Sequence, residues 1–251
     1  MGLKVINNSD FNLLGIENFN NSLRLKNYFK FIKKNHKKIE GDIFEFGVFR
    51  GRSLLSTALL LKSLNSKKKV IGFDSFSGFP TYKPQDNPIF FKRMFIKKQI
   101  NKLHYSRILK YQKILNFLNK KNKPNQVSSS GNFSDTSIKL IKKKLKFLNL
   151  NNVILIKGDF NKTIADYQKK NSNIKIFASN VDCDLYDGYK QALEFIWKHA
   201  KKKAYIHLDE YYSLKFPGAK IATDEFLKDK KNKVKKFKIK SDDFNRCYLI
   251  R

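Results

Sequence analysis

The sequence predicts an α/β protein with a Rossmann-like, doubly wound and mostly parallel sheet that ends in an antiparallel hairpin. Short apolar runs of the kind that form buried strands alternate with segments whose apolar residues recur every three or four positions. Acidic residues stand directly after several of these runs. A length of 251 residues suits one domain, so we expect residues 1–251 to fold as a single unit.

The first half of the predicted sheet is a βαβ unit. Residues 43–46 and 70–73 are apolar runs typical of buried strands, and residues 54–59 between them have helical spacing. Parallel strands joined in this way require a right-handed crossover. An amphipathic helix over residues 25–32 precedes the unit.

The alternation continues to the C-terminus. Further strands are predicted at residues 153–156, 174–181 and 204–208, and helices at 138–148, 193–200 and around 226. Ser134 or Asp135 is the expected N-cap of the first of these helices. The polar residues 241–245 separate two strand-like stretches, 234–239 and 247–250, and could close a hairpin between them.

Residues 89–126 exceed what a minimal domain of this class needs. The stretch is basic and aromatic, and Tyr111, Ile114, Leu115 and Leu118 fall at helical spacing. We interpret it as a basic helical insertion after the second strand. It could form a cap over the active site, a surface for a partner, or a solvated excursion.

The charge is extreme, with 53 Lys and Arg against 21 Asp and Glu, a net charge of +32. Such a field attracts nucleic acid, anionic membranes and acidic glycans. Only seven of the basic residues are Arg, however, and the chain is also rich in Asn, Ile and Phe. These residues and Lys share A/T-rich codons, so we favour compositional bias. Arginine, which reads base edges, is not enriched, so nucleic acid is not a favoured partner, although the charge leaves it open.

Cysteine usage and the N-terminus indicate a reducing compartment. Cys183 and Cys247 form no CxxC motif, and residues 1–10 lack a secretory signal. No apolar run reaches the ~20 residues that span a bilayer. We therefore expect a cytoplasmic protein without a membrane span.

The first candidate site is a glycine turn in residues 45–53, between a predicted strand and the helix that follows it. Gly47 and Gly51 let the backbone approach a ligand, and the helix start offers free N–H groups. A tight turn explains this motif equally well by itself, since it lacks the third glycine of the dinucleotide fingerprint. Asp74 ends the next strand, 27 residues after Gly47, where Rossmann-like folds bind ribose hydroxyls.

The second candidate site is a group of acids after two later strands. Asp182 and Asp184 follow one strand, and Asp209 and Glu210 follow the next. Parallel strands would gather these carboxylates at one edge of the sheet. Clustered carboxylates need a proton or a cation, and oxygen ligands favour Mg²⁺. Helix capping explains one such acid easily, but four less well.

These motifs resemble the macrocin O-methyltransferase family, which methylates sugar hydroxyls of macrolides and related glycosides. The resemblance spans about half of the chain. Its matches are EFGVFRG at 45–51, FDSFSGFP at 73–80, GNF at 131–133, KGDF at 157–160, DCDLY at 182–186 and DEY at 209–211.

The resemblance implies an O-methyltransferase that uses S-adenosylmethionine and Mg²⁺ or a similar divalent cation. The residues implied in cofactor binding are Glu45, Gly47 and Gly51 for the methionine part, Asp74 for the ribose, Gly158 and Asp159 near the adenine, and Ser53. The implied metal ligands are Asp182, Asp209 and Glu210. Asp184 is the implied general base, beside Asp182.

The sequence departs from the family pattern at Glu210, where the family usually has Asp, at Arg52, and at residues 201–203. The implied acceptor is a glycan or a glycoside. A phenolic small molecule, an RNA, and a non-catalytic Rossmann-like nucleic-acid-binding protein are the alternatives, and homo-oligomerisation stays open.

Overall fold

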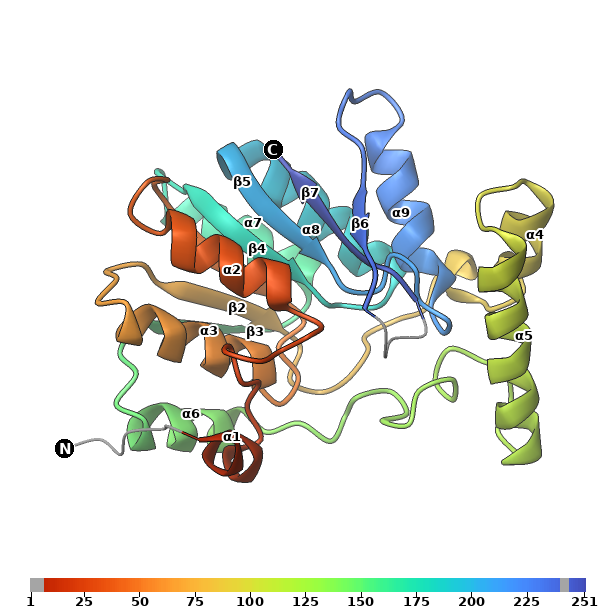
Figure 1. Ribbon diagram of the computed structural model, residues 1–251, viewed down its shortest axis with the longest axis horizontal. Helices are drawn as coiled ribbons and strands as arrows, with labels where there is room; N and C mark the ends of the chain where they lie inside the picture. The colour runs from red at the N-terminus through yellow and green to blue at the C-terminus, as the bar shows by residue number, and fades with distance from the viewer. Residues whose placement is uncertain (1–6, 240–243) are drawn as a thin grey trace.

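The computed structural model describes residues 7–239 and 244–251, and its centre is a seven-stranded sheet of order β3-β2-β1-β4-β5-β7-β6 (Figure 1). The strands are β1 (Asp42–Phe46), β2 (Val70–Asp74), β3 (Val153–Lys157), β4 (Ile176–Val181), β5 (Ala200–Leu208), β6 (Lys235–Phe237) and β7 (Arg246–Ile250). The first five pair in parallel, and β7 runs antiparallel to both β5 and β6. The predicted fold class is therefore confirmed.

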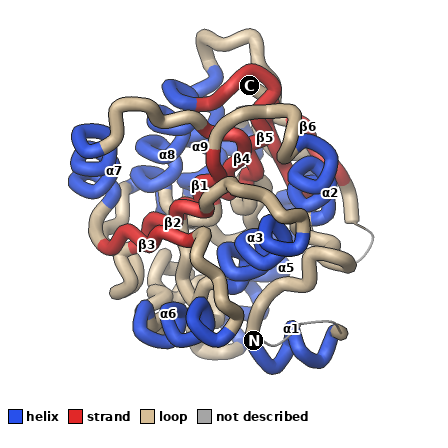
Figure 2. Tube along the Cα trace, turned by 90° about the vertical axis from the view of Figure 1, so that its left-hand side faces the viewer, coloured by secondary structure: helices blue, strands red, loops and turns tan. Residues whose placement is uncertain are grey.

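Helices cover both faces of the sheet (Figure 2). One face carries α2 (Lys26–Asn35) and α3 (Arg52–Ser63), with α1 (Asn8–Leu14) and α6 (Ile138–Phe147) beyond them, and the other carries α7 (Phe160–Lys170), α8 (Tyr186–His199) and α9 (Pro217–Leu227). Because successive strand residues point to opposite faces, Ile43 enters the first core and Phe44 the second. Both side chains are fully buried.

The carboxyl ends of the parallel strands share one edge, and the strand order reverses there between β1 and β4. Ligands bind at such a switch point in open α/β sheets. Gly47 follows β1 with φ of 91°, and a Cβ added to it would lie 2.0 Å from the carbonyl oxygen of Asp182 after β4. Glycine is thus required at this position, because the two strand ends approach too closely for any side chain.

Two local predictions differ from the structure. Ser137 caps α6, since its hydroxyl accepts a hydrogen bond from the amide of Leu140 at 3.2 Å. The predicted cap Asp135 pairs with Arg50 instead, and Ser134 precedes the helix by several residues. The strand predicted from residue 204 begins at Ala200 in the structure. The prediction started too late because the lysines in the first part of the strand interrupt its apolar pattern. Of the turn predicted at 241–245, residues 241–243 lie outside the described residues.

The segment after β2 contains α4 (Phe90–Ile96) and α5 (Lys102–Phe117), which stand away from the sheet (Figure 1). Its base is fixed by Asp86 in the short 3₁₀ helix Pro84–Asp86. The buried Asp86 carboxylate accepts the amide of Tyr186 at 2.7 Å and lies against Gly218, so it joins this base to the starts of α8 and α9. None of the helices in the described residues is both long and apolar enough to pass through a bilayer.

Candidate active site

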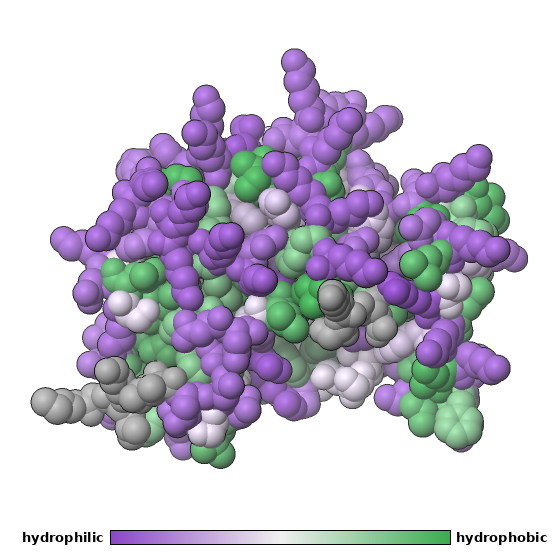
Figure 3. Space-filling model, in the orientation of Figure 1, coloured by the Kyte–Doolittle hydropathy of each residue, from purple (hydrophilic) through white to green (hydrophobic). Residues whose placement is uncertain are grey.

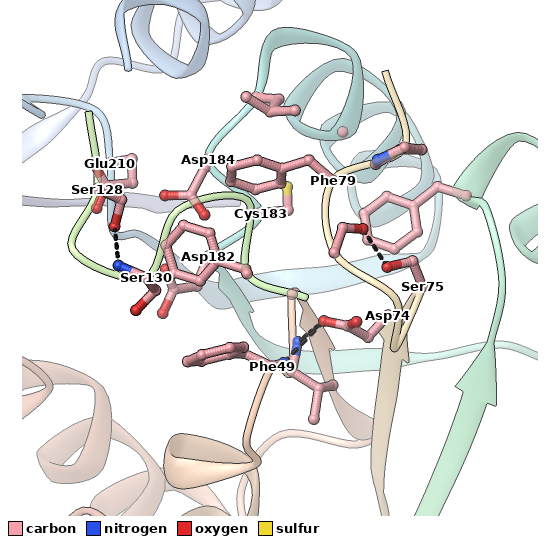
Figure 4. Close-up of a pocket in the computed structure, with 18 of the residues that line it drawn as sticks. Phe49, Asp74, Ser75, Phe79, Ser128, Ser130, Asp182, Cys183, Asp184 and Glu210 are labelled. Atoms are coloured by element: carbon pink, nitrogen blue, oxygen red, sulfur yellow. Dashed lines mark hydrogen bonds between the residues drawn. The ribbon is translucent and has the colours of Figure 1, made fainter. Parts of the chain in front are cut away.

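A cavity of about 330 Å³ opens at the carboxyl edge of the sheet, beside the ends of β1, β2, β4 and β5 (Figure 4). The predicted site residues that line it are Gly47, Ser53, Asp74, Gly158, Asp159, Asp182, Asp184 and Glu210. Glu45, Gly51 and Asp209 are not among the described residues that line it. Its volume falls within the range of roughly 300–1,000 Å³ that is usual for small-molecule sites.

Asp74 holds the glycine turn in place. One carboxylate oxygen accepts the backbone amides of Val48 and Phe49 at 2.7 and 2.8 Å, and the other accepts the amide of Phe76 at 2.6 Å (Figure 4). A carboxylate has about four lone-pair sites, so these bonds leave room for a ligand hydroxyl. Asp74 therefore shapes this wall of the cavity besides offering a polar group to it.

Gly51 has a different position from the rest of the turn. It is the N-cap of α3 with φ of 77°, and an added Cβ would lie 3.2 Å from the side chain of Ile141 on α6. Its left-handed backbone and this close packing account for the glycine. In the structure Gly51 therefore contacts α6 rather than the cavity.

Glu45 is buried behind the turn. It accepts a hydrogen bond from the Ser53 hydroxyl at 2.8 Å, and its second oxygen, Oε2, has no partner among the described residues. Burial raises the pKa of Glu45 to about 8, against the opposing effect of the Ser53 bond. At neutral pH the carboxyl is therefore mostly protonated in the native state.

We expect Glu45→Gln to stabilise the protein increasingly as the pH rises. The unfolded carboxyl loses its proton near pH 4.5 and the native one near pH 8, so the free energy of unfolding falls between these values and is constant above them. At pH 7 the wild type should lose about 3 kcal/mol relative to pH 4, and the amide cannot titrate. Urea unfolding at pH 5 and pH 8 measures the difference, with the exposed Glu194→Gln as control. A difference between variant and wild type that does not change with pH contradicts the assignment.

Three carboxylates gather at the other end of the cavity from Asp74 (Figure 4). Asp182, Asp184 and Glu210 each offer an oxygen, and these atoms lie within 4.8 Å of one another. Burial raises the pKa of all three, to about 7 for Asp182 and well above the usual value for Asp184, and the neighbouring acids add to the shift. The cluster therefore favours bound protons.

Asp209, the fourth acid, is in a different environment. Its Oδ1 lies 2.8 Å from Arg24 Nη1, 3.2 Å from Arg246 Nη1 and 3.4 Å from His207 Nε2. Although burial opposes it, the Arg24 charge and these neighbours hold the pKa of Asp209 well below its usual value. Arg24 also reaches Asp182, at 3.0 Å. The structure thus brings Asp182, Asp184 and Glu210 together at the cavity and engages Asp209 in ion pairs beside them.

Several residues that line the cavity were not predicted from the sequence. Arg24, just before α2, and Lys215, after β5, both line the cavity, as do Ser128, Ser129 and Ser130. Although burial disfavours its charge, Glu210 keeps the pKa of Lys215 above its usual value. The chain has only seven arginines, and two of them, Arg24 and Arg246, form ion pairs with Asp209. In so lysine-rich a sequence each arginine is therefore a candidate for a specific ion pair.

The carboxylate cluster fits a hard divalent cation. Its donors are all oxygens, as Mg²⁺ prefers. Oε2 of Glu210 is buried and has no hydrogen-bond partner among the described residues. A cation would replace the protons that the raised pKa values now favour.

Comparisons with known proteins agree with this architecture. The family model of the macrocin-O-methyltransferases (TylF) matches residues 20–150, just over half of the chain. The calicheamicin methyltransferase CalS11 superposes with a TM-score of 0.62 at 19% identity, covering 97% of this chain and 80% of that one. The O-methyltransferase NovP gives 0.58 at 18% identity, covering 88% and 75%. The apo structure of CalS11, described as a TDP-rhamnose 3'-O-methyltransferase, gives 0.53 at 21% identity, covering 90% and 79%. No curated protein sequence matches the chain.

Proposed function

Because the chain belongs to the macrocin-O-methyltransferase family, we propose that it methylates a sugar hydroxyl of a glycan or glycoside with the help of Mg²⁺ or a similar divalent cation. The methyl donor is S-adenosylmethionine. The observation that carries the proposal is the cavity with Asp74 at one end and the cluster of Asp182, Asp184 and Glu210 at the other. The sugar substrate of the similar protein CalS11 supports the choice of acceptor.

The glycine-turn end of the cavity suits the cofactor. Asp74 has about one lone-pair site left for a ribose hydroxyl. Gly158 and Asp159, in the loop after β3, are the neighbours proposed for the adenine. Ser53 lines the cavity at the start of α3, whose free N–H groups favour an anionic carboxylate, and Glu45 lies behind it.

The acidic end suits the acceptor. Asp182 and Glu210 would hold the cation. Asp209, the third ligand implied by the family resemblance, is engaged by Arg24, Arg246 and His207 in this structure. A cation bound there would supply a lower pKa for an acceptor hydroxyl. Asp184 is then left as the base.

The chain's own residues position the reaction and move the proton. The acceptor oxygen forms a bond to the methyl carbon as the carbon–sulfur bond breaks, and the electron pair stays on sulfur in S-adenosylhomocysteine. Asp184 takes the hydroxyl proton. Phe79 and Phe133, whose rings lie 5.0 Å apart in the cavity wall, help to exclude water. Most of the acceleration comes from holding the two reactants in line.

The test is an acceptor screen with methyl-labelled S-adenosylmethionine. We expect label on nucleotide sugars or glycosides, a fall of about a hundredfold or more in excess EDTA, and recovery with Mg²⁺. Full activity in EDTA would exclude the cation. Transfer only to catechols or to RNA would overturn the sugar acceptor, and failure to bind the cofactor would overturn the enzymatic proposal itself.

A further inference from the structure

The helices α4 and α5 carry a concentration of positive charge and exposed apolar surface. Residues 89–126 contain eleven Lys and Arg and no Asp or Glu. Of the thirteen large hydrophobic side chains exposed in the described part of the chain, seven lie between residues 89 and 118. Figure 3 shows apolar side chains interleaved with hydrophilic ones over this protrusion. Neither property is explained by the cavity chemistry.

The two faces of α5 differ in what they contact. The buried face attaches the helix to the protein and consists of His104, Ile108 and Leu115. On the opposite face Leu103, Ile114 and Phe117 are 58%, 47% and 85% exposed. Their spacing of eleven and three positions places them along one side of the helix. The exposed Lys110 and Lys113 lie among them, so this face combines apolar side chains with ammonium groups.

The protrusion is held in a fixed place beside the cavity. Asp86 ties its first end to α8, and the Tyr111 hydroxyl donates to the carbonyl of Val127 at its second end. The chain segments at both ends, including Phe79 and Ser128, line the cavity. The protrusion is therefore anchored at both ends to chain segments that line the cavity.

We propose that the exposed face of α4 and α5 docks onto an anionic phospholipid surface. Basic side chains are attracted to the negative leaflet, and interleaved apolar side chains enter the boundary between headgroups and acyl chains. A second copy of the chain is a poor partner for this face, because two strongly basic segments would be brought together and would repel each other. Nucleic acid would use the charge and could stack on Phe117, but the exposed leucine and isoleucine side chains have no π-face on which single-stranded bases stack. The lipid surface uses both features.

The experiment measures sedimentation of the full chain with vesicles, without cofactor or acceptor, so it is independent of the proposed function. We expect binding to vesicles of equimolar phosphatidylcholine and phosphatidylglycerol, and none to phosphatidylcholine alone. Replacing Leu103, Ile114 and Phe117 together by glutamine should weaken binding by about tenfold or more. Glutamine has a good helix propensity and the three side chains are exposed, so we expect the helix itself to be retained. The matched control replaces Leu140 and Phe147 by glutamine on the basic helix α6, where they are 51% and 50% exposed, and should change binding less than about twofold.

Several results would overturn the docking face. Equal binding of wild type and triple variant would mean that diffuse charge alone attaches the protein. An equal loss in the α6 control would place the contact elsewhere, and binding to single-stranded RNA without binding to the vesicles would favour nucleic acid. A Phe117→Trp variant gives a second readout that does not depend on the triple variant folding. Its indole emission should shift to shorter wavelength with anionic vesicles, and an unchanged spectrum contradicts insertion.

Discussion

Replacing Asp184 by asparagine is expected to lower the rate of methyl transfer by about 10²–10⁴-fold, the usual contribution of a general base. Asp184 is 7% exposed, lies in the carboxylate cluster and has φ of 60°. Asparagine has nearly the same shape and tolerates this left-handed conformation. The substitution therefore removes the proton acceptor with little change in backbone or packing.

Single-turnover kinetics should show this loss while calorimetry shows cofactor affinity close to that of the wild type. Asp166→Asn, a change of the same kind on α7 and away from the cavity, is the matched control and should retain full activity. An Asp184→Asn variant as fast as the wild type would remove the base from the mechanism. A variant that fails to bind the cofactor would instead give this residue a role in the other half of the cavity.

Replacing Asp74 by alanine is expected to weaken S-adenosylmethionine binding by roughly 10–150-fold, the equivalent of one hydrogen bond to a charged group. It should also lower the free energy of unfolding by about 3 kcal/mol, because the amides of Val48, Phe49 and Phe76 lose their acceptor. We expect both effects from one residue, since the proposed ribose contact would use the same carboxylate that holds the turn.

Asp74→Asn separates the two roles, because the amide keeps one acceptor oxygen for the turn but loses the charge. Thermal melting should place it between the wild type and the alanine variant, and calorimetry well below the melting temperature measures cofactor affinity. If the alanine variant melts lower but titrates the cofactor like the wild type, Asp74 only supports the turn, and the ribose assignment is wrong.

Local pattern succeeded where a residue's role depends on its neighbours along the chain. The apolar runs before Asp74 and Asp182 identified the ends of two strands. A buried strand can be recognised in this way because its side chains are apolar on both faces over a few consecutive residues. The spacing around Tyr111 likewise identified a helix. This spacing did not distinguish buried from exposed residues, however: Leu115 is buried, whereas Ile114 and Leu118 are exposed.

The sequence by itself determined the succession of the strands, most of the helices between them, the glycine after β1 and the acids at the carboxyl edge, since each follows from short-range periodicity and from the geometry of parallel sheets. It did not predict α1 or α7. Only the tertiary structure decided how those acids divide between ion pairs and cavity. Arg24 meets Asp209 across 185 positions of chain and Arg246 meets it across 37. No local pattern encodes such a contact, because charges attract through space and folding alone decides which of them are brought within reach.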